Sequence, residues 1–525
     1  MKIQHLLLIY SIALSYLLTS VQGLKTSDHS ASLNRGSFPA GFVFGASSSA
    51  YQYEGASNAD GRKPSIWDIF VKAQGEKIAD HSTGDAADEF YYRYKEDIAL
   101  MKDIGWDSFR FSISWPRVLP KGTITGGVNQ KGVDFYNSLI DELLSNGIKP
   151  LVTIFHWDVP QALEDEYGGF LSPKIVNDFR DYAEFCFKEF GDRVKNWVTL
   201  NEPNLFSQNG YATGTYAPGR CSNYIGNCTE GNSATEPYLV THNLILSHAA
   251  AAKYYREKYQ ASQKGVLGVA IDTRWMVPKF GIASTKAASR GLDFNFGWII
   301  HPMIYGDYPK TMRYLVGDRL PKFTQEQSHM VNGSLDFIGV NYYTARYADD
   351  STSYSSIYLS YTTDSHVNQT GKFPIEKNGI LIGQPTALSS IYIYPKGIRE
   401  LLQYLKREYN DPLIVISENG MADSNNGSLS IHEALNDSLR IEYHRLHLSY
   451  LLQAIQDGVN VNGYYIWSFL DNFEWASGYT VRFGINYVDY GNGLKRYPKN
   501  SAFWFKNFLE KKNVTAASPL LLSVE

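Results

Sequence analysis

The chain has 525 residues, of which 44% are hydrophobic and 19% charged, and this composition excludes a wholly disordered protein. Its 49 basic and 53 acidic residues give a net charge of −4, which excludes nucleic-acid binding by bulk charge because phosphate neutralisation needs a basic surface. The length would suit three or four average domains, but an α/β barrel can run long as one domain.

An apolar run at residues 6–18 opens the chain, shortly after Lys2. Val21-Gln22-Gly23 supplies a small-residue cleavage site behind it, which is typical of a secretory signal peptide. An uncleaved N-terminal anchor is the alternative, although the run is short for a membrane span. We therefore predict a signal peptide at residues 1–23, a mature protein that begins near Leu24, and no membrane partner.

Eight short apolar runs follow and alternate with amphipathic helical stretches. We predict strands at residues 42–46, 108–112, 149–155, 196–200, 266–272, 336–340, 413–417 and 463–467. Most are near-continuous apolar segments, as expected for strands buried on both faces. Helical periodicity covers residues 133–145, 176–190, 238–259, 397–409 and 439–457. This order predicts a single (β/α)8 TIM barrel over residues 24–525, with long loops at the C-terminal face.

Two doubly wound domains are the alternative architecture. They would need a linker, but no stretch of Pro/Gly/Ser composition divides the chain, and no internal repeat is present. The least regular region is 344–390, which is rich in Tyr, Ser, Thr and Asp. A long insertion after a strand usually carries a site or a lid, so we expect this region to border the site.

Three cysteines lie in the chain, and the secretory route makes disulfides available to them. Cys221 and Cys228 are seven positions apart in a loop rich in Gly, Asn and Ser, so we predict that they are bonded. Cys186 lies in a helical pattern and is expected to be a buried thiol. The same route permits N-glycosylation, and the sequence offers six N-x-S/T sites: Asn227, Asn332, Asn368, Asn426, Asn436 and Asn513.

Polar side chains gather where the predicted strands end. The third strand is followed by His156-Trp157-Asp158, the fourth by Asn201-Glu202-Pro203, the sixth by Asn341-Tyr342-Tyr343, the seventh by Glu418-Asn419-Gly420, and the eighth ends at Trp467-Ser468, with Glu474-Trp475 beyond. In a (β/α)8 barrel the active site lies at these ends. Stability alone asks for apolar residues and turns there, so the pattern indicates a site.

Glu202 and Glu418 are the two carboxylates at these strand ends. Two carboxyl groups in one pocket push their pKa values apart, which gives an acid and a base at the same pH. Cleavage of a glycosidic bond needs that pair. The alternative is that either glutamate is a salt-bridged rim residue.

Side chains that can hold a sugar surround this pair. Gln52, His156, Asn201 and Glu474 can bond to hydroxyls, and Trp467, Trp475 and Phe483 can cover the apolar face of a pyranose ring. Each of these alone is more often a core or loop residue. No spacing matches a zinc, calcium or Walker site, and the hydrolase elbow Gly-x-Ser-x-Gly is absent, so we expect no metal and no cofactor.

Four motifs of the chain resemble the signature motifs of glycoside hydrolase family 1. They are Thr199-Leu200-Asn201-Glu202-Pro203, Ile416-Ser417-Glu418-Asn419-Gly420, the N-terminal Phe42-Val43-Phe44-Gly45-Ala46 with Tyr51-Gln52-Tyr53-Glu54-Gly55, and the segment from Trp467 to Trp475. The similarity runs from about Phe38 to Leu509. The disulfide loop and secretory start look most like plant β-glucosidases.

The resemblance implies a retaining β-glucosidase that removes terminal β-D-glucosyl residues from O-glycosides through a covalent intermediate. It implies Glu202 as general acid and base and Glu418 as nucleophile. By the same matching, Gln52, His156, Asn201, Glu474 and Trp475 hold the non-reducing sugar, Trp467 is the ring platform, and Arg110 and Tyr343 contact the nucleophile. The implied partner is a small glycoside, with no oligomeric state defined.

Three positions discriminate within the family. Myrosinases have Gln where this chain has Glu202, so it looks like an O-glycosidase. Ser417 replaces the more usual Thr, and Ser390 stands where many plant members have a Trp that lines the aglycone site. A transglucosidase and a non-catalytic sugar-binding protein are the alternative functions. The expected location is the secretory pathway, ending in the apoplast or the vacuole.

Overall fold

The computed structural model describes residues 33–351, 357–373 and 379–510. The predicted signal peptide (residues 1–23) and the sequon Asn513 lie outside these described residues.

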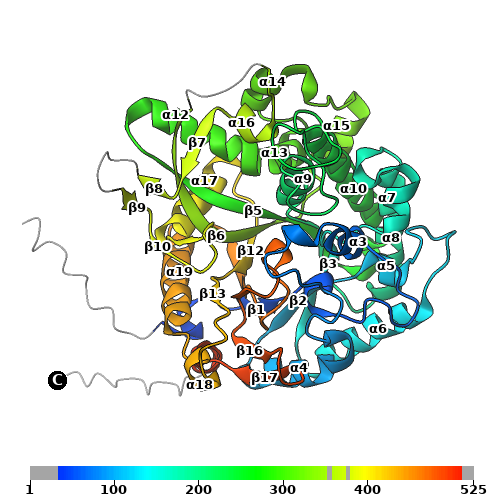
Figure 1. Cartoon of the computed structure of the whole chain (residues 1–525), viewed down its shortest axis with the longest axis vertical. Helices are drawn as coiled ribbons and strands as arrows, with labels where there is room; N and C mark the ends of the chain where they lie inside the picture. Colours follow the sequence, from blue (N-terminus) through cyan, green and yellow to red (C-terminus); the bar gives the residue numbers. More distant parts are fainter. Residues whose placement is uncertain (1–32, 352–356, 374–378, 511–525) are drawn as a thin grey trace, which may run out of the picture.

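Eight parallel strands form a closed barrel at the centre of the molecule (Figure 1). They are β1 (Val43–Ser47), β2 (Ser108–Ser112), β3 (Lys149–Phe155), β4 (Asn196–Asn201), β5 (Val266–Pro278), β6 (Phe337–Asp350), β12 (Ile414–Asn419) and β14 (Val461–Ile466). Each strand pairs with the next, and β14 pairs with β1 to close the circle. The predicted (β/α)8 barrel is confirmed, and the alternative of two doubly wound domains is wrong.

Helices surround the barrel on all sides in Figure 1. The longer ones are α4 (Phe90–Ile104), α6 (Gln130–Ser145), α8 (Ile175–Phe190), α9 (Pro203–Tyr211), α10 (Glu236–Lys258), α12 (Gly281–Leu292), α13 (Trp298–Tyr305), α17 (Lys396–Glu408), α19 (Ser438–Gln456) and α20 (Asn500–Leu509). In α8, Phe179, Tyr182, Cys186 and Phe187 recur at helical spacing and are buried. An apolar stripe on one side of a helix packs against the protein interior, so α8 covers the barrel with this side.

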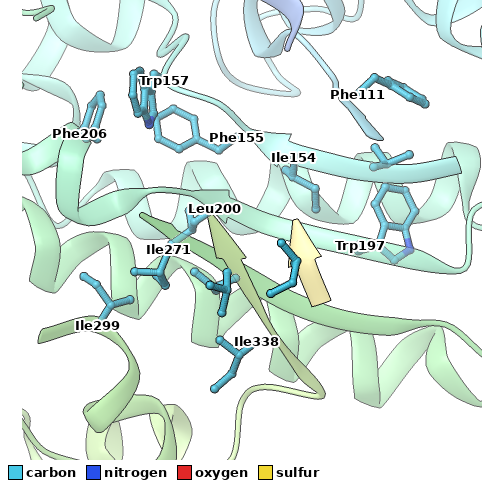
Figure 2. Packing of buried hydrophobic residues seen from close by; sticks show 14 of the residues in the cluster. Phe111, Ile154, Phe155, Trp157, Trp197, Leu200, Phe206, Ile271, Ile299 and Ile338 are labelled. Carbon is cyan, nitrogen blue, oxygen red and sulfur yellow. The ribbon is translucent and has the colours of Figure 1, made fainter. Parts of the chain in front are cut away.

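Two of the three hydrophobic clusters among the described residues hold these layers together. Leu151, Val198, Ala270, Phe337 and Tyr465 form a small cluster whose members all come from barrel strands, so it fills the barrel interior. The much larger cluster lies between strands and helices. Figure 2 shows part of it, in which Phe155 of β3 packs against Phe206 of α9 with ring centroids 5.4 Å apart.

Strands β5 and β6 are longer than predicted. The sequence prediction ends them at 272 and 340, but their parallel pairing continues to Pro278 and Ala348. A further strand, β7 (Val367–Thr370), adds antiparallel to the end of β6. The polar residues Asp272 and Asn341 look like strand ends in the sequence, yet the chain stays extended beyond them because Met276, Ala345 and Ala348 are buried.

The predicted disulfide is present, with Cys221 and Cys228 bonded and their Cα atoms 5.5 Å apart, while Cys186 is buried and free. Five sequon asparagines are exposed: Asn227, Asn332, Asn368, Asn426 and Asn436. Within the described ranges, none of the helices has the length and apolar character needed to span a bilayer.

Candidate active site

A cavity of about 270 Å³ opens among the predicted sugar-site residues at the carboxyl ends of the barrel strands. Its walls include nine of the predicted residues: Gln52, His156, Glu202, Tyr343, Glu418, Trp467, Glu474, Trp475 and Phe483. Arg110 and Asn201 are buried and hydrogen-bond to these residues. The structure thus brings all eleven residues of the predicted sugar site together.

The backbone departs from regular structure where these side chains emerge. The strand register shifts between Val198 and Asn201, and again between Ile416 and Glu418. Such irregularities re-aim side chains at strand ends. Glu202 and Trp475 also have positive φ angles of 44° and 50°, a left-handed conformation that costs non-glycine residues of order 1–3 kcal/mol each. Strain of this kind persists where the surroundings enforce it and is typical of functional sites.

Glu418 lies at the end of β12 with both carboxylate oxygens bonded. Arg110 Nη1 donates to Oε1 at 2.5 Å, and the Tyr343 hydroxyl donates to Oε2 at 2.5 Å. Burial raises the pKa of Glu418, while the Arg110 charge and the Tyr343 hydrogen bond oppose that rise. Of the two carboxyl groups, Glu418 therefore has the surroundings that favour the anion more strongly.

Glu202 follows β4 and is 5% exposed. Asn341 Nδ2 donates to its Oε1 at 2.7 Å, and Asn341 in turn accepts from the Ser417 hydroxyl. Burial raises the pKa of Glu202 well above its ordinary value, and the negative charges of Glu418 and Asp272 add to the rise. Glu202 consequently retains its proton to higher pH than Glu418.

The cavity has a deep end, formed by Gln52, His156, Trp467, Glu474 and Trp475. Gln52 Nε2 bonds to Glu474 Oε2 at 3.3 Å, and the Ser49 hydroxyl fixes the Gln52 oxygen at 2.7 Å. Burial raises the pKa of Glu474 to about 7. An amide and a carboxyl group side by side can accept and donate several hydrogen bonds, which suits vicinal hydroxyls.

His156 adds a polar edge and an aromatic face to the deep end. Its Nε2 lies 3.0 Å from Asn201 Nδ2, so the amide is assigned as donor and the ring as acceptor there. Burial and the Arg110 charge lower the pKa of His156 well below its ordinary value, so the ring is neutral. Its Nδ1 bonds to none of the described residues. The ring stacks between Trp467 and Trp475, with centroids 6.1 and 5.9 Å away.

The cavity has a mouth whose lining is half-buried or exposed: Leu205, Asn209, Tyr216, Arg274, Leu388 and Ser390. None of these except Ser390 is identified by the sequence. They come from α9 and the loop after it, from β5 and from the segment that precedes α17, and no strand-end motif marks those places. Ser390 lines the mouth as the resemblance implies.

Asp272 also escapes the sequence reasoning, and Asn341 is marked there as following the sixth predicted strand but is given no role. Asn341 bonds to Glu202, and Asp272 lines the cavity at 8% exposure. Asp272 ends the fifth predicted strand and Asn341 follows the sixth, so a position at a strand end is the signal that marks both. In the part of the chain that the structure describes, no group of three His, Cys, Asp or Glu side chains is placed to hold a metal ion. The arrangement offers two carboxyl groups whose surroundings raise their pKa values unequally, beside hydroxyl-binding side chains, which suits glycosidic bond cleavage.

Known proteins are similar to this chain in sequence and in fold. Residues 34–514 match the profile of glycosyl hydrolase family 1. The chain is 58% identical to beta-glucosidase 17 of Arabidopsis thaliana over 511 residues, covering 96% of this chain and 98% of that protein. It is 54% identical to an isoflavonoid 7-O-beta-apiosyl-glucoside beta-glycosidase of Dalbergia nigrescens over 480 residues, covering 91% of this chain and 86% of that one.

A solved rice β-glucosidase has the same fold. That structure is a glutamate-to-glutamine variant in a covalent complex with glucose from GA4GE. It matches this chain with a TM-score of 0.89 at 50% identity, covering 91% of this chain and 100% of that chain.

Proposed function

The chain belongs to glycosyl hydrolase family 1 and is a retaining β-glucosidase, and from this premise we propose that Glu202 is its general acid and base and Glu418 its nucleophile. The observation that carries the assignment is the contrast between their hydrogen bonds. Glu418 accepts from a guanidinium and a phenol, whereas Glu202 accepts from an uncharged amide. The first environment favours an anion, whereas at Glu202 burial and the negative charges of Glu418 and Asp272 outweigh the Asn341 hydrogen bond and favour the carboxylic acid.

Cleavage then proceeds in two displacements. In the first, Glu202 gives its proton to the glycosidic oxygen as a Glu418 oxygen bonds to the anomeric carbon, and the aglycone leaves as an alcohol. Arg110 and Tyr343 keep Glu418 ionised until it attacks. In the second, Glu202 takes a proton from water, and that water displaces Glu418 from the anomeric carbon. Two inversions leave the product in the β configuration.

The deep end holds the glucose in this proposal. Gln52 and Glu474 bind adjacent hydroxyls, His156 donates from Nδ1, and Trp467 covers the apolar face of the ring. Asn201 orients His156 through its amide. Phe483 and Tyr343 close the side wall, with ring centroids 6.2 Å apart. The aglycone occupies the mouth.

The protein is further proposed to enter the secretory pathway behind a signal peptide at residues 1–23 and to act in the apoplast or the vacuole. The disulfide between Cys221 and Cys228 supports this, because such bonds persist in oxidising compartments. The exposure of Asn227, Asn332 and the other three described sequons supports glycosylation.

The test is a covalent label. A 2-deoxy-2-fluoro-β-glucosyl substrate with a good leaving group should add one fluoroglucosyl unit to the protein, and peptide mapping should find it on Glu418. A label on Glu202 would overturn the assignment. Adding an alcohol to turnover reactions separates the two fates of the intermediate, since free glucose marks hydrolysis and an alkyl glucoside marks transglucosylation.

A further inference from the structure

Arg274 stands at a boundary in the mouth of the cavity. It lines the catalytic cavity and also a second cavity of about 290 Å³, whose polar walls include Gln208, Asn295, Tyr361, Thr362 and Gln369. Arg274 therefore borders both the catalytic cavity and a hydroxyl- and amide-lined space. Arg274 is the cation that the two cavities share.

The strand ladder places Arg274 opposite the site. β5 and β6 pair Thr273 with Tyr342 and then Trp275 with Ala345, so Arg274 faces two residues of β6, Tyr343 and Thr344. Both of these residues line the catalytic cavity. A strand irregularity next to an active site commonly re-aims a side chain. Here it sets a guanidinium across the ladder from the tyrosine that bonds to Glu418.

Among the described residues, the guanidinium of Arg274 makes one long ion pair and no hydrogen bond. Its nearest carboxylate is that of Asp272, at 3.8 Å, which is beyond hydrogen-bonding distance. Across the described ranges, Arg274 donates no hydrogen bond, although a guanidinium carries five N–H donors. Its side chain is 27% exposed, so a ligand in the mouth can reach it.

A second arginine adds to the positive charge. Arg346 is buried beside Arg274, and burial together with the Arg274 charge lowers the pKa of Arg346. Arg346 is occupied, since it donates to Thr344 and to the carbonyl of Ser390, and it stacks on Tyr392. With Asp272 as the nearby anion, two guanidiniums and one carboxylate leave one positive charge unbalanced at this side of the mouth.

We propose that Arg274 binds a carboxylate carried by the aglycone, so that glucosides of acidic alcohols and phenols are preferred over their neutral counterparts. A carboxylate accepts two parallel bonds from a guanidinium, which fixes the orientation of the aglycone as well as adding affinity. This proposal rests on the proposed function, because it takes the deep end as the place of the glucose. It names a specificity residue at the mouth and leaves the chemistry to Glu202 and Glu418.

The competing explanation is structural. Arg274 would then serve as a counter-charge for Asp272, whose Oδ2 is buried without a hydrogen bond among the described residues. The two explanations differ in what they predict for matched substrates. A counter-charge acts on every glucoside alike, whereas an anion-binding residue acts on those that carry the anion.

The experiment compares two glucosides that differ in one charge: the phenolic β-glucoside of 3-(4-hydroxyphenyl)propanoic acid and that of its methyl ester. The two methylenes insulate the phenol, so both leaving groups depart equally well. At pH 6 the acid is ionised. Wild-type enzyme should cleave the acid with a kcat/KM about tenfold above that of the ester, the range of a charged hydrogen bond.

Three variants sharpen the comparison. Arg274→Gln should lower kcat/KM for the acid by about tenfold to a hundredfold and leave the ester within about threefold. Arg274→Lys should keep part of the preference, because it keeps the charge but loses the fork. Lys322→Gln removes an exposed charge elsewhere and should leave the preference unchanged. Free 3-(4-hydroxyphenyl)propanoate should inhibit wild type competitively and Arg274→Gln much less.

A wild type that cleaves the acid no better than the ester overturns the proposal. So does an Arg274→Gln variant that slows both substrates by the same factor, which is the structural outcome. If Arg274→Gln fails to fold, the wild-type ratio, the inhibition and the lysine variant still decide. Failure of the proposed function looks different, because the wild type would then cleave neither glucoside nor 4-nitrophenyl β-glucoside.

Discussion

The deep end and the mouth of the cavity are built in different ways. In the deep end, Gln52, His156 and Trp467 are buried, and the two polar members of this trio are held by hydrogen bonds to other side chains. In the mouth, Leu205 and Leu388 are half-buried and Arg274 is free of protein hydrogen bonds within the described residues. The first region is organised to recognise one shape, and the second leaves its groups available to what enters. In the proposed function, glucose and aglycone thus meet regions that differ in burial and in hydrogen bonding.

Removal of the proposed nucleophile should have the largest effect, because it should abolish activity whichever aglycone occupies the mouth. It therefore removes the difference between the deep end and the mouth. Glu418→Ala should lower turnover of every glucoside by at least about 10⁴-fold, because loss of a nucleophile in other enzymes costs up to about 10⁶-fold. Azide should restore part of the rate and yield the α-glucosyl azide. Circular dichroism should show an intact fold. Recovery of the β-azide would mean that the roles of Glu202 and Glu418 are exchanged.

The proposed acid separates the two regions more finely, because its importance depends on the aglycone. Glu202→Gln removes the transferable proton and should slow alkyl glucosides by about 10²–10⁴-fold. Dinitrophenyl glucoside needs no proton, so it should release a burst of dinitrophenol and then stall, with azide accelerating the slow phase. Equal losses for both substrates in the first step would show that Glu202 positions the sugar.

The same variant tests the raised pKa of Glu202. A general acid works in its protonated form, so wild-type kcat/KM for alkyl glucosides should fall as pH rises through that pKa. Glu202→Gln has no such proton to lose, and this alkaline limb should disappear from its profile.

Removal of the disulfide tests whether the mouth of the cavity can be destabilised without an effect on the deep end. Cys221 and Cys228 close a loop that follows α9. Tyr216, between α9 and that loop, donates a backbone hydrogen bond of 3.1 Å to Asn209 of α9. Cys221→Ser with Cys228→Ser should lower the free energy of unfolding by about 2.5 kcal/mol in the chain-entropy model. KM should rise for large aryl glucosides and not for methyl glucoside. A parallel rise for methyl glucoside would show that the mouth and deep end are one unit.

The smallest effects come from single contacts in each region. His156→Ala removes a proposed bond to the sugar and should lower kcat/KM by about tenfold for methyl and aryl glucosides alike. Leu388→Ala should lower it by a few-fold for aryl glucosides alone. Steady-state kinetics should be measured for both variants with methyl glucoside and with an aryl glucoside, which gives four kcat/KM values to compare with wild type. If Leu388→Ala slows methyl glucoside equally, the mouth does not belong to the aglycone.

The sequence predicts the deep end far better than the mouth, for a physical reason. Strand ends of a barrel converge on one rim, so residues such as Asn201 and Glu418 can be placed together once the strands are recognised. Arg274 lies on a strand that continues past its expected end, and nothing in its neighbours signals that continuation. Leu205 lies on a helix face that turns inward after Glu202, which only the folded chain defines.

The barrel strands also differ in how well the sequence predicts their bounds. β2 and β3 have the predicted bounds because they are short apolar runs between turns. β5 and β6 do not, since polar residues that face the site interrupt their apolar pattern at Asp272 and Asn341. A polar residue after an apolar run can mean either a functional side chain or the end of a strand, and only tertiary packing distinguishes the two.

The hydrogen bond between Gln52 and Glu474 joins residues 422 positions apart. A ribosome that makes this chain releases Gln52 early and Glu474 near the end, after both Glu202 and Glu418. Contacts of such long range also form late in folding. A nascent chain therefore holds every strand-borne carboxylate without a complete sugar pocket. Glucoside cleavage therefore waits until synthesis of the chain has passed Glu474.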